Sequence, residues 1–400
     1  MGVLGISTRY GTAPIQRGGW LDALRFIVAC MIIVSHYQAS APIPLSSFHP
    51  VFERAYLLTD FFLIDSGYVL ARVYSERVLA GRMSRRAFFA KRFLRVAPGH
   101  LVMITLLVGL VLAAGAVGAL PRHPEWFDWR QLPAQVLLVQ SYGVPGGLGW
   151  NAPSWSISAL LGCYAAFPLL LRLTHRMPAW GSLAIAAAVL LVGNLVAWRL
   201  IDAPIYQMAM RYGFLRALPL FFIGMALARF SQAVYVPPRL GGAIGIAAAL
   251  ALCLVQGLGP NSLVSLLLIS VIILAAAAIP VRRRNRPVET VALASYSMFI
   301  TNEVVRIAWF GLSNALQSRL HLGTAAMWAL WGLGMAAALA FAFGFYFVFD
   351  KPSQAWFKGW LARNKGRFGG GAVAPAEDPL PGASAAPAFG RRVQAPAPVG

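Results

Sequence analysis

An arginine and a histidine stand on the first strongly apolar segment of the chain, and their types and spacing could support chemistry. Arg25 and His36 are eleven residues apart in LDALRFIVACMIIVSHYQAS. On a helix that spacing is about three full turns, so both side chains point to one side at depths about 16 Å apart. A neutral imidazole removes protons near pH 7, and a guanidinium binds anions. Ionisable groups in a membrane span usually mark a functional site.

Each residue also has a simpler interpretation. An arginine near a helix end can reach toward lipid headgroups, and a histidine can hydrogen-bond a neighbouring helix. The shared helix face favours the functional interpretation. A second basic pair, Arg92 and Arg95, is three residues apart before Pro98 and suits a phosphate or pyrophosphate, although membrane anchoring alone would also explain it.

The composition is that of a membrane protein. Hydrophobic residues make up 58% and charged residues 12% of 400 residues, and the mean hydropathy is +0.66. The net charge of +21 falls in short runs between apolar segments without a continuous basic face, which argues against nucleic-acid binding. Cys30, Cys163 and Cys253 lie in apolar segments without metal-ligand spacing, so neither a metal site nor a disulfide is expected.

Apolar runs of about 20 residues predict an all-α polytopic protein with about ten transmembrane helices. Basic clusters at every second connection place both termini in the cytoplasm by the positive-inside rule. The first segment is expected to stay uncleaved, and Leu132 to Gln140 is expected to form a re-entrant or interfacial piece. We predict spans near 20–41, 56–74, 97–119, 152–171, 181–200, 213–230, 240–257, 262–280, 290–311 and 324–349.

These spans divide the chain into three parts. Residues 1–19 form a cytoplasmic segment, and 20–350 form the transmembrane domain. Residues 351–400 form a cytoplasmic basic segment and a tail rich in Gly, Ala and Pro, expected to be disordered.

Several segments in consistent order resemble the acyltransferase-3 family of integral membrane O-acyltransferases. The first span resembles the family's Arg-x10-His helix, and the resemblance runs from about residue 20 to 350. The chain departs from the family at three polar positions, which are Leu160 in place of a common glutamate, Asp65 in place of an apolar residue, and Asn302 where histidine is frequent. The other similar segments are TDFFLIDSGYVLA (Thr59 to Ala71), RFLRVAP (Arg92 to Pro98), NAPSWSISALLGCYAAFPLL (Asn151 to Leu170), LRALPLFFIGMALARF (Leu215 to Phe230) and LASYSMFITN (Leu293 to Asn302).

The resemblance implies transfer of an acyl group, expected to be acetyl, from acyl-CoA to a hydroxyl of a cell-envelope or exported glycan or lipid-linked sugar. It also implies the inner, cytoplasmic membrane of a bacterium, with membrane lipid around the protein. His36 would be the general base, since imidazole suits proton removal from a weak nucleophile. Asp60 or Asp65 would accept the other imidazole N–H, with Asp60 favoured; a helix N-cap is the alternative for Asp60. Arg25, Arg92 and Arg95 would hold the donor's phosphates, and no metal is required.

The outer side would receive the acceptor. Asn151, Ser154, Trp155 and Ser156 are expected to bind it, although Asn or Ser there could simply cap a helix. Ser156 or Ser158 as an acyl-accepting nucleophile is a further alternative. Trp126, Trp129, Tyr142 and Trp150 could stack on sugars or belong to an interfacial belt, and Glu303 and Arg306 are expected to neutralise each other.

Two other functions fit the same residues. Ten spans with internal charges also suit a transporter or flippase of a glycan or glycolipid, although no internal repeat is detected. A catalytically silent relative that binds a lipid-linked sugar or a partner is the third possibility.

Overall fold

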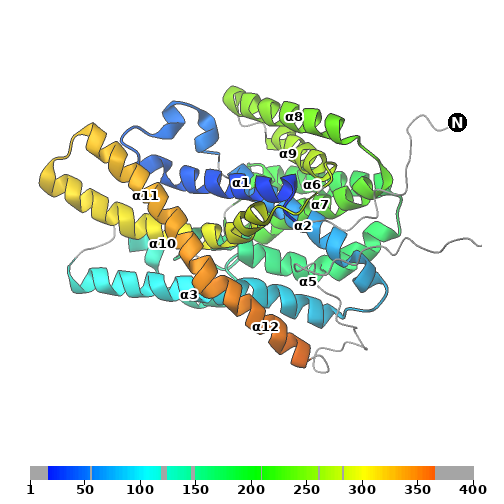
Figure 1. Ribbon diagram of the computed structural model, residues 1–400, viewed down its shortest axis with the longest axis horizontal. Helices are drawn as coiled ribbons and strands as arrows, with labels where there is room; N and C mark the ends of the chain where they lie inside the picture. Colours follow the sequence, from blue (N-terminus) through cyan, green and yellow to red (C-terminus); the bar gives the residue numbers. More distant parts are fainter. Residues whose placement is uncertain are drawn as a thin grey trace, which may run out of the picture.

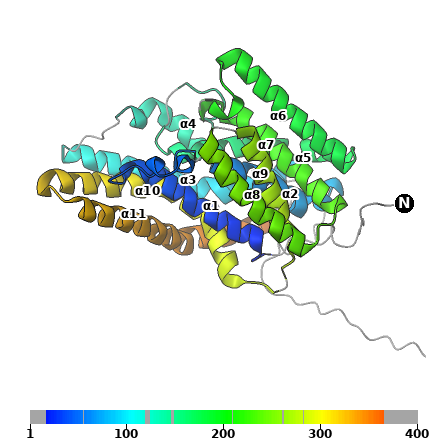
Figure 2. The ribbon, with the colours of Figure 1, turned by 90° about the horizontal axis from the view of Figure 1, so that it is seen from above.

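The computed structural model describes residues 17–54, 56–118, 124–145, 149–208, 210–259, 262–281 and 283–364. These residues form helices, short 3₁₀ turns and connecting loops, with no strand among them. Most long helices run roughly side by side, and α6 and α8 lie on the outside of the bundle (Figures 1 and 2). The helices are α1 Trp20–Tyr37, α2 Tyr56–Leu79, α3 Arg85–Ala116, α4 Leu132–Val136, α5 Trp155–His175, α6 Ala179–Ile201, α7 Gly213–Ala233, α8 Pro238–Leu258, α9 Ser262–Ala277, α10 Arg286–Leu320, α11 Thr324–Phe345 and α12 Lys351–Arg363.

A helix covers each of the ten predicted spans, and the all-α membrane class is confirmed. In the described part of the chain, seven helical segments, containing α1, α3, α5, α6, α7, α8 and α11, are long and apolar enough to cross a membrane. Helix α9 has only 16 residues, and α2 and α10 carry several charged side chains each. The number of crossings and the position of the termini therefore stay predictions. The predicted disordered tail and most of the predicted N-terminal segment lie outside the described residues.

Helices α2 and α7 form the closest pair in the centre of the bundle. Two glycines face the opposite backbone, so that a Cβ on Gly67 would stand 2.0 Å from the Phe221 carbonyl oxygen. A Cβ on Gly224 would stand 1.9 Å from the Ile64 carbonyl oxygen. Glycine allows this approach because it has no side chain. The two helices therefore touch along their backbones and fix where the side chains of α2 lie.

Helix α3 begins twelve residues before the predicted span because Ser84 caps it, its Oγ accepting the Ala87 N–H at 3.1 Å. The proline within it, Pro98, cannot donate to the Leu94 carbonyl. Gln354 of α12 donates to that carbonyl at 3.3 Å and to the Arg95 carbonyl at 3.1 Å. A polar side chain from a neighbouring helix thus satisfies the backbone that the proline leaves open.

Helix α11 passes through one π-helical turn, Tyr346–Asp350, directly into α12. The two helices form one oblique rod across the bundle (Figure 1). Asp350, at the end of this turn, is buried and accepts from Arg95 of α3 at 2.7 Å and from Ser297 of α10 at 3.3 Å. Three helices therefore meet at this carboxylate. The predicted piece at Leu132 to Gln140 contains the short helix α4, followed by a turn.

Candidate active site

His36 lies near the end of α1 and contacts α10. Its Nδ1 is 2.7 Å from Oδ1 of Asn302. The neighbouring Tyr37 donates its hydroxyl proton to the Asn302 carbonyl oxygen at 2.8 Å, and Trp331 of α11 donates to the Tyr37 carbonyl oxygen at 3.0 Å. The imidazole is half-buried. Two helices, α10 and α11, therefore hold this end of α1 in place.

The expected carboxylate partner of His36 is not found, and the expectation is corrected here. Arg216 of α7 donates to Oδ1 of Asp60 from Nε at 3.0 Å and from Nη2 at 2.7 Å. Asp65 accepts from Arg25 at 2.7 Å. A buried charge without a partner is costly, so buried guanidiniums and carboxylates pair with each other. The N-cap alternative for Asp60 is also wrong, because α2 begins at Tyr56 and Asp60 lies inside it.

Every buried carboxylate in the described part of the chain forms an ion pair. Six carboxylates are buried, and each of them pairs with an arginine, which excludes them as proton acceptors unless a pair opens. The half-buried imidazole of His36 contacts the neutral amide of Asn302 and takes part in none of these ion pairs. The pairs are Asp22–Arg25, Asp60–Arg216, Asp65–Arg25, Glu289–Arg284, Glu303–Arg306 and Asp350–Arg95.

The three arginines predicted to bind an anion lie on α1 and α3, but their partners differ. Arg25 is held between Asp22 at 2.9 Å and Asp65 at 2.7 Å. Arg95 is neutralised by Asp350 and also covers the Tyr296 ring at 4.7 Å.

Arg92 alone of these three has no carboxylate partner in the described residues. It donates to the Tyr74 hydroxyl and lies 4.8 Å from the centre of that ring. Its charge is therefore the one that remains available to an anion.

A cavity of about 370 Å³ lies between the start of α1, the middle of α2 and the ends of α7 and α9. Tyr68 and Arg72 of α2 converge there on the hydroxyl of Ser231, at 3.2 and 3.1 Å. Asp22 also lines this cavity, so it adjoins the Arg25 ion pair. Neither His36 nor the three predicted arginines line it. The sequence reasoning missed Arg72 here, although a charge in an apolar segment was the signal used for Arg25.

The four residues predicted to bind an acceptor lie at the start of α5 and are buried. Ser154 donates to the Asn151 carbonyl oxygen at 2.7 Å, and Ser156 donates to the Pro153 carbonyl oxygen at 3.3 Å. No side-chain cap is formed, so the capping alternative is wrong. The ring of Trp155 lies 5.3 Å from the Arg216 guanidinium, and Asn151 donates to the Ile300 carbonyl oxygen at 3.3 Å.

The alternative of a serine nucleophile also finds no support in these contacts. The Ser158 hydroxyl donates to the Leu138 carbonyl oxygen at 2.7 Å and accepts from the Ser141 N–H. Both it and Ser156 are buried and bonded to backbone. Asn151, by contrast, donates to the Ile300 carbonyl oxygen on α10, two residues before Asn302, the partner of His36.

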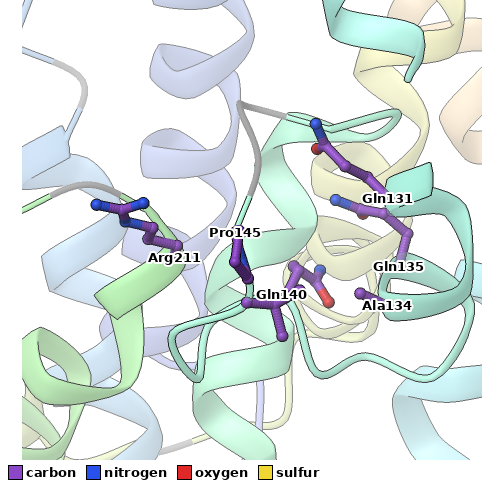
Figure 3. Close-up of a pocket in the computed structure, with 7 residues that line it drawn as sticks. Gln131, Ala134, Gln135, Gln140, Pro145 and Arg211 are labelled. Carbon is purple, nitrogen blue, oxygen red and sulfur yellow. The ribbon is translucent and has the colours of Figure 1, made fainter. Parts of the chain in front are cut away.

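The loop before α5 carries aromatic and amide side chains. Trp150 is buried and packs edge-on against Trp129, whose side chain is exposed. A small cavity of about 10 Å³, enough for one water molecule, lies among Gln131, Gln135, Gln140 and their neighbours (Figure 3).

On α10, the predicted neutralisation of Glu303 by Arg306 is confirmed, with contacts of 2.9 and 2.6 Å.

Comparison with known proteins gives the class of this chain. Residues 19–347 match the acyltransferase domain that defines the acyltransferase-3 family, so the chain belongs to this family. It is 33% identical over 179 residues to the acyltransferase MdmB of Streptomyces mycarofaciens, a match covering 43% of each chain. It is 27% identical over 183 residues to nodulation protein 10 of Rhizobium leguminosarum bv. viciae, covering 42% of this chain and 48% of that protein. The matches thus span less than half of either relative, and no solved structure matches the chain.

Proposed function

We propose that this protein is a membrane acyltransferase that moves an acyl group, acetyl in the first instance, from acyl-CoA to a hydroxyl of a cell-envelope or exported glycan. The observation that carries the proposal is the half-buried imidazole of His36, fixed through Nδ1 and located at the opposite end of α1 from Arg25. Membership of the acyltransferase-3 family supports the reaction type.

The donor would bind at the end of the bundle that carries the arginines. Arg92 would contribute the uncompensated charge, and Arg25 and Arg95 would add donors from within their ion pairs. The cavity beside Arg72 has the size of a small-molecule site and would take part of the donor. His36 does not line that cavity, so the thioester must travel along α1, about 16 Å for eleven helical residues.

The chemical step requires one base. Nε2 of His36 would take the acceptor's hydroxyl proton while the hydroxyl oxygen attacks the thioester carbonyl carbon. The new C–O bond forms, the C–S bond breaks, and the imidazolium returns the proton to the departing coenzyme A sulfur. Asp60 would act at a distance, by holding Arg216 against Trp155. No metal takes part in these steps.

The acceptor would approach the other end of α1. Asn151 reaches α10 there, and Trp129 and Tyr142 expose rings that could stack on a sugar. With cytoplasmic termini, this end would face outward from a bacterial inner membrane, and the donor end would face the cytoplasm. Ser154, Trp155 and Ser156 would form the wall behind Asn151.

Radiolabelled acetyl-CoA tests the function with the full chain in lipid nanodiscs and a panel of glycans and lipid-linked sugars. We expect label to move to one acceptor class. His36→Gln should reduce this transfer at least about 100-fold, whereas His321→Asn, which removes an exposed imidazole, should not. Normal turnover by His36→Gln would overturn the assignment of the base. Movement of an acceptor across liposomes without label transfer would favour a transporter.

A further inference from the structure

Asn302 occupies the position beside His36 where a carboxylate was expected. We propose that Asn302 fixes the tautomer of His36, with the proton on Nδ1 and the lone pair on Nε2. This inference deepens the proposed function and rests on it for its catalytic meaning. Asn302 is a positioning residue here, because it acts through the imidazole.

The orientation of the Asn302 amide is determined by its other neighbours. Its Nδ2 lies 2.5 Å from the Phe299 carbonyl oxygen and 3.4 Å from the Met298 carbonyl oxygen. Carbonyl oxygens only accept, so the NH₂ group must face them. The amide oxygen Oδ1 is therefore the atom that faces His36.

That orientation decides which imidazole nitrogen carries the proton. An amide oxygen cannot donate, so at 2.7 Å His36 Nδ1 must be the donor. In the neutral ring the lone pair then stands on Nε2. Within the described residues Nε2 has no hydrogen-bond partner, so it is available to a substrate hydroxyl.

Glu303, the next residue on α10, does not compete for this role. Both of its carboxylate oxygens accept from Arg306 in a two-point contact. The Tyr37 hydroxyl holds the Asn302 backbone to α1, so the amide cannot shift along the helix without breaking this bond. The ring is therefore oriented by a neutral group, while the adjacent charges cancel each other.

The tautomer can be measured directly by ¹⁵N NMR of the full chain, labelled at histidine, in nanodiscs at neutral pH. The chain has six histidines, and the signals missing from His36→Gln assign those of His36. We expect a protonated Nδ1 and an unprotonated Nε2. A proton on Nε2 of the neutral ring would overturn the inference.

Variants of Asn302 test whether the tautomer matters for turnover. Asn302→Leu keeps the branched shape of the side chain but removes the acceptor, and we expect a mixed tautomer signal and a fall in kcat of at least about tenfold with little change in the KM for acetyl-CoA. Asn302→Asp keeps an acceptor oxygen and should retain the Nδ1–H tautomer and more of kcat than Asn302→Leu. An unchanged kcat in Asn302→Leu would count against the positioning role.

A neighbouring substitution provides the matched control. Thr301 is fully buried on the same helix and donates to the Ser297 carbonyl oxygen, and among the described residues it forms no hydrogen bond with His36. Thr301→Val should leave both the spectrum and kcat as in the parent protein. Equal losses of kcat in Thr301→Val and Asn302→Leu would show that the effect comes from disturbed packing of α10, and would overturn the inference.

The two proposals fail separately. The NMR signal does not depend on turnover, so the expected tautomer in a protein that transfers no acyl group would overturn the proposed function and keep the assignment of Asn302. If the neutral ring carries its proton on Nε2 and His36→Gln abolishes transfer, the assignment of Asn302 is overturned and the proposed function is kept.

Discussion

Arginine–carboxylate pairs determine the chemistry of individual side chains in this bundle. Asp60 is fully buried, and Arg216 is the group that compensates it. Asp65 and Asp22 share Arg25 in the same way. These contacts remove the acids from proton transfer and leave an imidazole beside a neutral amide.

The Asp60–Arg216 pair gives a stability prediction. Arg216→Met leaves the Asp60 charge buried without a partner, so we expect a loss of about 3–5 kcal/mol in the free energy of unfolding. Asp60→Leu combined with Arg216→Met removes both charges and should recover most of that loss. Thermal unfolding in detergent, followed by tryptophan fluorescence, measures both variants. A double variant no more stable than Arg216→Met would contradict this account.

Arg92 gives a binding prediction. Its guanidinium has no carboxylate partner in the described residues, so Arg92→Gln should raise the KM for acetyl-CoA about tenfold, the equivalent of about 1.4 kcal/mol, with a smaller effect on kcat. Arg86→Gln removes an exposed arginine from the same helix and serves as the control. Steady-state kinetics at fixed acceptor concentration separates the two parameters. An equal rise in KM in both variants would indicate that the positive surface attracts acetyl-CoA in general and that Arg92 forms no specific binding site for it.

The sequence located His36 and Arg25 on one helix because eleven residues on an α-helix have a fixed geometry. It could not predict their partners, because those depend on which helices pack together. Arg216 was within reach of the same reasoning, as the first of two arginines in the apolar segment LRALPLFFIGMALARF. Asn302 was recognised only as a departure from the family, and its contact with His36 emerges from the packing of α1 on α10.

The α2–α7 contact is the element pair with the least tolerance for added atoms. A methyl group at Gly224 would meet the Ile64 carbonyl oxygen at 1.9 Å, so the backbones must separate. We expect Gly224→Ala to cost about 3 kcal/mol or more, at the upper end for overpacking. Gly109→Ala on α3, where no atom lies within 4 Å, is the matched control. Similar melting temperatures for the two variants would contradict the close approach.

Helix positions followed from the apolar runs, whereas several helix ends did not. The start of α3 extends into a basic stretch that a hydropathy argument assigns to a loop, and Ser84 fixes it. The break at Pro98 is repaired by Gln354, 256 residues further along the chain, a contact that no local pattern contains.

The arrangement of the bundle across the membrane is the largest prediction still open. With the native cysteines replaced, single cysteines at Arg82 and Lys358 should react with an impermeant maleimide only after the cytoplasmic face is opened. A cysteine at Arg130 should react in intact cells. All three positions are exposed in the structure. Labelling of Arg82→Cys and Arg130→Cys from one side would reject the proposed topology.

The polar side chains of α2 and α10 have a consequence for how the chain reaches the bilayer. Both helices fall outside the set of segments apolar enough to cross unaided. Because carboxylates and guanidiniums oppose insertion, each helix must enter together with the helix that neutralises or hydrogen-bonds it. For α2, Arg25 of the preceding α1 neutralises Asp65, whereas Arg216 of α7, about 150 residues later in synthesis, neutralises Asp60. We therefore expect α2 to reach its final position only after α7 has been made. On this account, insertion of the bundle is cooperative and is completed late in synthesis.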